Sequence, residues 1–410
     1  MKTSCFRGTF MQFIDLAAQQ ERIKDLIDAG IQKVMAHGQY IMGPEVRELE
    51  KALAGFSGSK HAVSCASGTD ALLMALMAHE IGPGDAVFTT PFTFIATAEV
   101  ISLLGATPVF VDIDPVTFNI DPSRLEQAVT AVEECDGAVH PLPLPIRKGK
   151  ASGKKLTPKG VIPVDLFGLP ADYDAIDAVA DDRGLFVIED AAQSLGASYK
   201  DRPAGSLGDI GCTSFFPAKP LGCYGDGGMC FTDNDDLAEI LRSIRVHGQG
   251  EDRYDNVRVG INGRLDTIQA AILLAKFELF PEEIVLRQEV AKGYNKFVGD
   301  LAPDLTIPRV PEGYRSVWAQ YSILADDENH RRAIMEALKS HDIPSVVYYP
   351  KPLHRQTAYA ALGYVAGDFP VSEEISRRIF SLPMHPYLAR EDQERICEIM
   401  AEVSIRADNG

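Results

Sequence analysis

From residue 61 onward, short apolar runs alternate with stretches of helical periodicity, and this alternation constrains the fold more than any other feature of the sequence. The first runs are residues 61–67, 86–90 and 107–113, and two more follow at 160–168 and 185–190. The runs are apolar throughout, as in strands that are covered on both faces of a sheet. The pattern predicts an α/β fold with a largely parallel sheet and helices on both faces.

The C-terminal third of the chain lacks this rhythm. A long helical pattern spans residues 265–301, with a break expected near Pro281, and the remainder mixes short strands with helices. A chain of 410 residues exceeds what one hydrophobic core usually supports, so two domains are expected. We assign residues 11–264 to a large domain, and residues 265–410 to an interdomain helix with a small C-terminal α+β domain.

Residues 137–160 interrupt the strand–helix alternation. This stretch is rich in proline, glycine and lysine, and it carries six basic residues and no acidic one. A surface loop or disordered insertion is one interpretation, and a basic flap near an anionic substrate is the other.

The bulk composition excludes several classes of protein. The net charge is -18 and the isoelectric point is near 4.9, which disfavours binding to nucleic acid. The seven cysteines form no CxxC pair, and the histidines show no metal-binding spacing, so we expect reduced thiols and no metal. There is no signal peptide pattern and no apolar run long enough to span a membrane, so a cytoplasmic location is expected.

A glycine turn follows the first predicted strand, in the sequence Cys-Ala-Ser-Gly-Thr-Asp at residues 65–70. A helix that begins here offers free backbone N–H groups and a positive dipole end, which together bind anions. Gly68 lets the backbone approach a ligand closely, and Thr69 adds a hydroxyl. An ordinary helix cap at Ser67 or Thr69 would give the same pattern.

A carboxylate stands at the end of another apolar strand. Asp190 follows the run Val-Ile-Glu at residues 187–189, and ligands of open α/β sheets bind at this edge. Such a carboxylate could be a metal ligand, a general base, a partner for a cationic ring, or a helix cap.

Lys219 lies in an apolar loop that prolines and glycines enclose, at residues 213–222. Desolvation would lower the pKa of such a lysine and make its amine nucleophilic, as a Schiff-base lysine requires. Taken alone, a structural or surface lysine explains the residue equally well.

The order of these three segments is that of fold-type I enzymes dependent on pyridoxal 5'-phosphate (PLP), and the chain resembles the DegT/DnrJ/EryC1/StrS family of sugar aminotransferases. The resemblance covers nearly the whole chain from Met11, apart from residues 137–160. It rests on the stretches SGTDAL, PFTFIATAE, VFVDIDPVTFNID, IEDAAQSLGA, TSFFPAKPLGCYGDGG, RVHGQ, INGRLDTIQAAIL and SLPMHPYL.

The resemblance implies how PLP is held. Lys219 is expected to bind the cofactor covalently and to act as the catalytic acid and base. Asp190 is expected to face the pyridine nitrogen and keep it protonated, and the ring cation should in turn keep the pKa of Asp190 low. Gln193 is expected beside the 3-oxygen of the ring. Phe94 is expected to stack on the ring face, with Phe92 as the alternative.

The resemblance also implies the phosphate and substrate contacts. Gly68, Thr69 and Ser214 are expected to hold the cofactor phosphate. Asn262 is expected to reach that phosphate from a partner subunit, which makes the enzyme a homodimer with shared active sites. Arg264 is expected to meet an anionic part of a nucleotide sugar.

Two departures from the family pattern bear on the substrate. Relatives that act on uronic acids often read His-Tyr-Pro where this chain has Tyr348, Tyr349 and Pro350, and Gly263 replaces a bulkier residue. Neutral Tyr348 favours a sugar carboxylate less than a cationic histidine would. His354 is either a substrate contact or a structural residue.

The family pattern implies a transamination from L-glutamate, with pyridoxamine 5'-phosphate (PMP) as the intermediate form of the cofactor. The acceptor that we favour is a UDP-linked 3-keto-N-acetylhexosamine, from which amino sugars of a surface polysaccharide or lipid A are made. Alternatives are the 3-keto uronic acid, a 4-keto-6-deoxy sugar nucleotide, or a non-catalytic PLP or sugar sensor. A dehydratase of the same fold is disfavoured, because such relatives replace the lysine with histidine.

Overall fold

A seven-stranded sheet forms the centre of the computed structural model, which describes residues 11–146, 155–252 and 254–408. The strands lie side by side in the order β1-β9-β8-β5-β4-β2-β3. Their bounds are β1 (His61–Cys65), β2 (Asp85–Thr89), β3 (Thr107–Phe110), β4 (Thr157–Ile162), β5 (Phe186–Asp190), β8 (Ile210–Ser214) and β9 (Gly228–Thr232).

All neighbours from β8 to β3 are parallel, and β9 pairs with both β8 and β1 in the antiparallel direction. β9 is therefore the only strand of this sheet that runs against the others. The largely parallel sheet predicted from the sequence is confirmed. The carboxyl ends of β1, β5 and β8 consequently meet at one edge, where ligands of such sheets bind.

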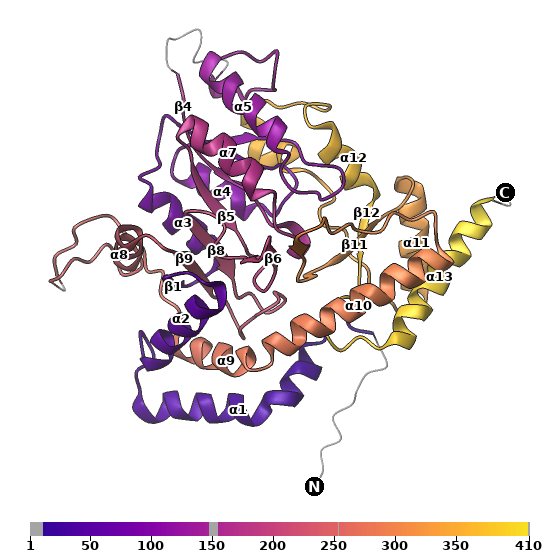
Figure 1. Cartoon of the computed structure of the whole chain (residues 1–410), viewed down its shortest axis with the longest axis horizontal. Helices are drawn as coiled ribbons and strands as arrows, with labels where there is room; N and C mark the ends of the chain where they lie inside the picture. The colour runs from indigo at the N-terminus through magenta and orange to yellow at the C-terminus, as the bar shows by residue number, and fades with distance from the viewer. Residues whose placement is uncertain (1–10, 147–154, 253, 409–410) are drawn as a thin grey trace.

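Helices cover both faces of the sheet, as Figure 1 shows. One buried core joins the sheet to α2, α5, α7 and α9, and the other joins it to α3, α4 and α8. Their bounds are α2 (Pro44–Ser57), α3 (Gly68–Ala78), α4 (Ala96–Leu103), α5 (Pro122–Glu134), α7 (Tyr173–Arg183), α8 (Asp235–Ile244) and α9 (Thr267–Phe277), and α1 (Leu16–His37) packs along α9.

The long helical pattern divides as expected. α10 (Phe280–Leu301) follows α9 and has Pro281 in its first turn, where proline is tolerated. In Figure 1 α10 extends from the sheet domain to α11 and α13, and it packs against α13. A third buried core surrounds these contacts. The remaining elements are β6 (Ser198–Tyr199), β7 (Arg202–Pro203), β10 (Tyr314–Arg315), β11 (Tyr321–Leu324), β12 (Ile379–Leu382), η1 (Leu166–Gly168), η2 (Leu353–Arg355), η3 (Thr357–Leu362), α11 (Glu328–Ser340), α12 (Pro370–Arg378) and α13 (Arg390–Asp408).

The structure differs from the sequence-based expectation around residues 137–160. Residues 157–160 belong to β4, a strand inside the sheet. The side chains of His140, Leu142 and Ile146 are buried, and the His140 ring hydrogen-bonds the Phe110 carbonyl oxygen. Both ends of the proposed insertion are therefore integrated into the domain, and the central residues 147–154 lie outside the described part of the chain. The domain boundary between residues 264 and 265 stays a prediction.

Within the described residues, no helix is both long enough and apolar enough to cross a lipid bilayer.

Candidate active site

The carboxyl ends of three strands bring the predicted cofactor segments together. In the register of β5 and β8, Asp190 lies beside Cys212, two residues before Ser214. β1 leads into the turn at Ser67 and Gly68, and a Cβ atom on Gly68 would lie 2.6 Å from Ser214 Cβ. Only glycine fits at such an approach. The first turn of α3 and the end of β8 therefore face each other across a narrow gap, next to the strand that carries Asp190.

The side chain of Ser67 caps α3. Its hydroxyl oxygen accepts a hydrogen bond from the Asp70 backbone N–H at 3.0 Å, as an N-cap serine does. The capping alternative therefore holds for Ser67, whereas Thr69 lies two residues further on, inside α3, and is half-buried.

Asp190 is buried, with 5% of its surface exposed. Its Oδ2 accepts a hydrogen bond from the Thr97 hydroxyl at 2.8 Å, and its Oδ1 accepts one from the Ala192 backbone N–H at 3.2 Å. Burial raises the pKa of Asp190, whereas these two donors and the charge of Lys219 oppose that rise. The two donors thus orient the carboxylate, and among the described residues no cation is in direct contact with it.

Lys219 is half-buried in the loop after β8. Its backbone N–H donates to the Phe216 carbonyl oxygen at 2.8 Å, which closes a turn around the lysine. Burial lowers the pKa of Lys219, and the charge of Asp190 opposes that shift. The two groups therefore act on each other electrostatically, and a larger share of the amine is neutral and nucleophilic than in an exposed lysine.

A second buried lysine supports this loop. Lys276 of α9 donates to the Gly222 carbonyl oxygen at 2.6 Å, and its ammonium group lies 4.6 Å from the centre of the Tyr224 ring. The Gln269 side chain also bonds the backbone of Tyr224. Two side chains of α9 thus hold the loop that carries Lys219 in place.

Gln193 is held on both ends of its amide. Its Oε1 accepts from the Phe167 backbone N–H at 2.8 Å, and its Nε2 donates to the Tyr349 hydroxyl at 3.3 Å. Tyr349 also contacts Phe92, ring edge to face, with centroids 6.1 Å apart. Tyr349 therefore lies beside the predicted cofactor residues rather than at a remote substrate position.

The two phenylalanine candidates differ in exposure. Phe92 is fully buried, so neither face of its ring is free, whereas Phe94 is 56% exposed. Of the two, only Phe94 offers a ring face to a ligand. The structure favours Phe94, the residue first chosen from the sequence.

The predicted substrate residues do not form one group in the single chain. Asn262 is exposed, and Arg264 is half-buried with a buried Nε atom that has no hydrogen-bond partner among the described residues. No hydrogen bond or ion pair joins either side chain to Asp190 or Lys219 in the part of the chain that the structure describes. Tyr348 is half-buried, and burial raises the pKa of its hydroxyl.

His354 is enclosed in the protein. Its exposed fraction is 2%, its Nε2 lies 2.9 Å from Glu373 Oε1, and its ring packs on Phe369. Burial lowers the pKa of this histidine, and Glu373 opposes that shift. These contacts favour the structural alternative over a substrate contact.

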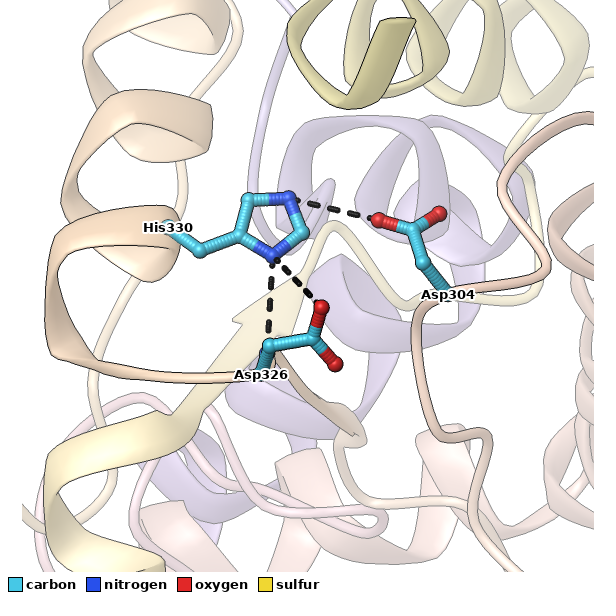
Figure 2. A group of neighbouring side chains, drawn as sticks. All are labelled: Asp304, Asp326 and His330. Carbon is cyan, nitrogen blue, oxygen red and sulfur yellow. Dashed lines mark hydrogen bonds and ion pairs between the residues drawn. The ribbon is translucent and has the colours of Figure 1, made fainter. Parts of the chain in front are cut away.

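The described residues include one group with the side-chain types of a metal site, which Figure 2 shows. His330 Nε2 lies 3.4 Å from Asp304 Oδ2, and its Nδ1 lies 3.8 Å from Asp326 Oδ2. These distances are those of ion pairs, and the surface position of Asp326 is typical of solvated acidic groups. We assign no metal to this group.

Residues 21–401 match the DegT/DnrJ/EryC1/StrS aminotransferase family. The chain belongs to this family. The resemblance seen in the motifs and the α/β fold expected from it are confirmed, and the chain is an aminotransferase by membership.

Named relatives of the DegT/DnrJ/EryC1/StrS family align along nearly the full chain. The UDP-2-acetamido-2-deoxy-3-oxo-D-glucuronate aminotransferase of Pseudomonas aeruginosa is 49% identical over 94% of this chain and 98% of its own. The UDP-N-acetyl-3-dehydro-alpha-D-glucosamine 3-aminotransferase of Acidithiobacillus ferrooxidans is 40% identical over 96% of this chain and 98% of its own.

Solved structures of the family agree with the fold. A DegT/DnrJ/EryC1/StrS aminotransferase from Brucella abortus superposes with a TM-score of 0.87 at 49% identity, covering 96% of this chain and 99% of its own. The NtdA protein of Bacillus subtilis, which carries bound PMP, superposes with a TM-score of 0.84 at 26% identity, covering 97% of this chain and 85% of its own.

Sequence reasoning missed Thr97, whose hydroxyl orients the Asp190 carboxylate. The residue stands within the family stretch PFTFIATAE, but 93 positions separate it from Asp190. Its contact with Asp190 depends on how α4 packs over the sheet, and no local pattern reports that.

We expect Thr97→Val to raise the pKa of Asp190 by roughly one to two pH units, because a hydrogen bond to a charged group contributes about 1.5–3 kcal/mol. Carbon-13 NMR of labelled aspartate carboxyl groups in the cofactor-free protein measures this pKa, with Asp190→Asn to assign the signal. Thr97→Ser keeps the hydroxyl and should keep the wild-type value. Equal pKa values in the valine and serine variants would show that the hydroxyl does not orient Asp190.

Proposed function

We propose that this aminotransferase uses PLP bound at Lys219 to transfer the amino group of L-glutamate to a UDP-linked 3-keto-N-acetylhexosamine. The observation that carries the proposal is the placement of Lys219 and Asp190, a nucleophilic amine and a buried carboxylate that influence each other at one edge of the sheet. Both named relatives are UDP-3-keto-sugar aminotransferases, which supports that class of acceptor; the one at 40% identity is named for the neutral sugar and the one at 49% for the uronic acid.

The residues present fit PLP. The approach of Gly68 to Ser214 leaves no room for a Cβ atom, so the first turn of α3 and the Ser214 hydroxyl lie side by side, and together they can offer backbone N–H groups and a hydroxyl to a phosphate. No cation of the described chain is in direct contact with Asp190, and a protonated pyridine nitrogen would supply one. Lys219 lies within the electrostatic reach of Asp190, as a covalent anchor for the same ring requires.

In our proposal each residue has one task. Bound PLP supplies an electron sink that stabilises negative charge on the substrate carbon. Asp190 keeps the pyridine nitrogen protonated, and Thr97 holds the carboxylate in place. Lys219, when its amine is free, carries the proton between the amino-acid carbon and the cofactor, first for glutamate and then in the reverse sense for the sugar.

The remaining cofactor contacts follow from the same placement. Gly68, Thr69 and Ser214 hold the phosphate. Gln193, which Phe167 and Tyr349 orient, lies beside the 3-oxygen of the ring. Phe94 covers the ring face with its exposed side chain.

The choice of an acceptor sugar without a carboxylate rests on the side chains of Tyr348 and His354. Burial raises the pKa of Tyr348, so its hydroxyl is neutral at physiological pH, and His354 is already paired with Glu373. Neither side chain supplies a free cation for a sugar carboxylate. We place the reaction in the cytoplasm, since the six cysteines that the structure describes are all free.

A homodimer completes the proposed site. Asn262 is exposed, and Arg264 has a buried N–H without a partner in the described chain. Near them, the backbone of Ile41 forms a β-bridge with Asp266, and the apolar side chain of Ile41 is 48% exposed. A second subunit that covers this surface would bury the apolar group and bring Asn262 and Arg264 to the site of its partner.

Lys219→Ala should lower turnover by roughly 10³-fold or more, because the covalent anchor and the proton carrier are lost together. Added PMP should still bind. Absorbance spectroscopy and coupled assays measure both effects, and Lys200→Ala, which changes an exposed lysine, serves as the control. Full activity of the Lys219 variant would refute the role.

The visible band of the wild-type protein tests the competing sensor role. The purified protein should be yellow, and L-glutamate should bleach the band as the amino group is transferred. One relative, 43% identical, bears the name of a pleiotropic regulatory protein. A band that no amino acid bleaches would favour a regulator of that kind.

A panel of amino sugars run in the reverse direction tests the acceptor. UDP-3-amino-N-acetylhexosamine with 2-oxoglutarate should yield glutamate faster than the corresponding 3-amino uronic acid, because neither Tyr348 nor His354 supplies a cation for the carboxylate. Faster turnover of the uronic acid would overturn the neutral substrate. Activity only with 4-amino dTDP sugars would leave transamination intact and change the sugar class.

Mixed dimers test whether the active sites are shared. Lys219→Ala and Asn262→Asp should each be inactive alone, the second because a carboxylate repels the phosphate. A co-expressed mixture should recover about a quarter of the wild-type sites, since half of the dimers are mixed and each has one intact site. A mixture that stays inactive would show that Asn262 acts within its own chain.

A further inference from the structure

Two carboxyl groups lie fully buried directly behind Asp190. Asp165 follows β4, and Glu189 precedes Asp190 on β5, with its side chain on the other face of the strand; neither is exposed to solvent. The proposed function gives these two residues no role.

Both carboxyl groups accept several hydrogen bonds. Asp165 Oδ1 accepts from the Ala171 N–H and the Tyr173 hydroxyl, both at 2.9 Å, and its Oδ2 accepts from the Ser194 hydroxyl at 2.8 Å. Glu189 accepts from two backbone N–H groups, those of Gly205 at 2.6 Å and Leu207 at 2.8 Å.

Each of the two carboxyl groups also lies within hydrogen-bonding reach of the other and shifts its pKa. A contact between two carboxyl oxygens requires a proton, since neither carboxylate has a donor. The titratable groups that face the pair are Tyr173 from α7, Asp190 from β5 and Cys212 from β8. None of these is a cation, so two full negative charges at this place would be strongly unfavourable.

The pair is joined to the proposed catalytic residues through the backbone. The Asp165 N–H donates to the Asp190 carbonyl oxygen at 3.1 Å, and the Ser194 hydroxyl that bonds Asp165 belongs to the residue after Gln193. Phe167, two residues after Asp165, donates its N–H to the Gln193 side chain. Segment 165–168 therefore contacts both Asp190 and Gln193.

We propose that Asp165 and Glu189 share one proton, and that this proton positions Asp190 and Gln193 by tying segment 165–168 to the end of β5. The two acids are positioning residues, since they reach the reaction only through Asp190 and Gln193. The shared proton is independent of the proposed function, and only the positioning role rests on it.

The proton makes stability depend on pH in a defined direction. Burial raises the pKa of Asp165 to about 7 and the pKa of Glu189 well above its usual value, and the charge of Asp165 raises that of Glu189 further. The folded state thus holds a proton that the unfolded chain releases above the ordinary pKa values of about 4. The contribution of this proton to the free energy of unfolding is complete below the ordinary pKa values, and it is lost as pH rises through the folded-state pKa values.

Urea unfolding of the cofactor-free protein between pH 5 and 9 tests the shared proton. In the wild type, one retained proton changes the unfolding equilibrium constant by up to about tenfold per pH unit. Asp165→Asn should remove that contribution, because its Oδ1 still accepts from Ala171 and Tyr173 while its amide donates a permanent hydrogen to Glu189. An Asp165→Asn protein with the wild-type slope would overturn the proposal.

Glu45→Gln is the matched control. Glu45 is equally buried, but it is paired with Lys33 and His37, and these partners contribute to a lowered pKa. In this variant the unfolding equilibrium constant should change with pH as it does in the wild type. If both variants lost the pH dependence of unfolding, its cause would be the general loss of a buried charge, and the shared proton would be overturned.

PLP titrations of the cofactor-depleted protein test the positioning role. The wild-type dissociation constant should rise as pH increases from 7 to 9, and that of Asp165→Asn should rise less. If the PLP dissociation constants of the two proteins changed with pH in parallel while their unfolding equilibria did not, the positioning role alone would be overturned. Failure of the wild-type protein to bind PLP at any pH would instead refute the proposed function and leave the unfolding result as it stands.

Discussion

The electrostatic coupling of Asp190 and Lys219 is the constraint on which the rest of the site depends. Burial pushes both groups toward their neutral forms, and the charge of each one opposes that push in the other. Opposite charges in a low-dielectric place are costly to separate. The strand that ends at Asp190 and the loop that carries Lys219 must therefore be held rigidly, and many of the contacts described here serve that purpose.

The surroundings of the two residues are arranged accordingly. Asp190 ends a strand with parallel neighbours on both sides, and the buried acids Asp165 and Glu189 lie behind it. Lys219 has no strand of its own, and α9 holds its loop through Lys276 and Gln269. The acid thus depends on the sheet for its position, whereas the amine depends on a helix.

The sequence predicted the features that repeat locally or follow strand ends. The buried strands, the break at Pro281 and the family were all visible in the order of residues, and Asp190 and Lys219 were chosen from that order. The roles of Thr97 and Asp165 were not predictable, and the alternatives for His354 could not be decided, because each depends on contacts outside its own segment: Thr97 on Asp190, Asp165 on Ser194, and His354 on Glu373 and Phe369. The ends of the 137–160 stretch were misjudged because their proline and lysine content hides residues that pack in the core.

The near contact of Gly68 with Ser214 limits how this scaffold can diversify. Position 68 admits no side chain, so evolution or design cannot adjust affinity for a bound anion there by adding a functional group. Variation must instead enter at Thr69 or at Ser214. Changes of acceptor specificity can then accumulate at the periphery while the innermost turn stays the same.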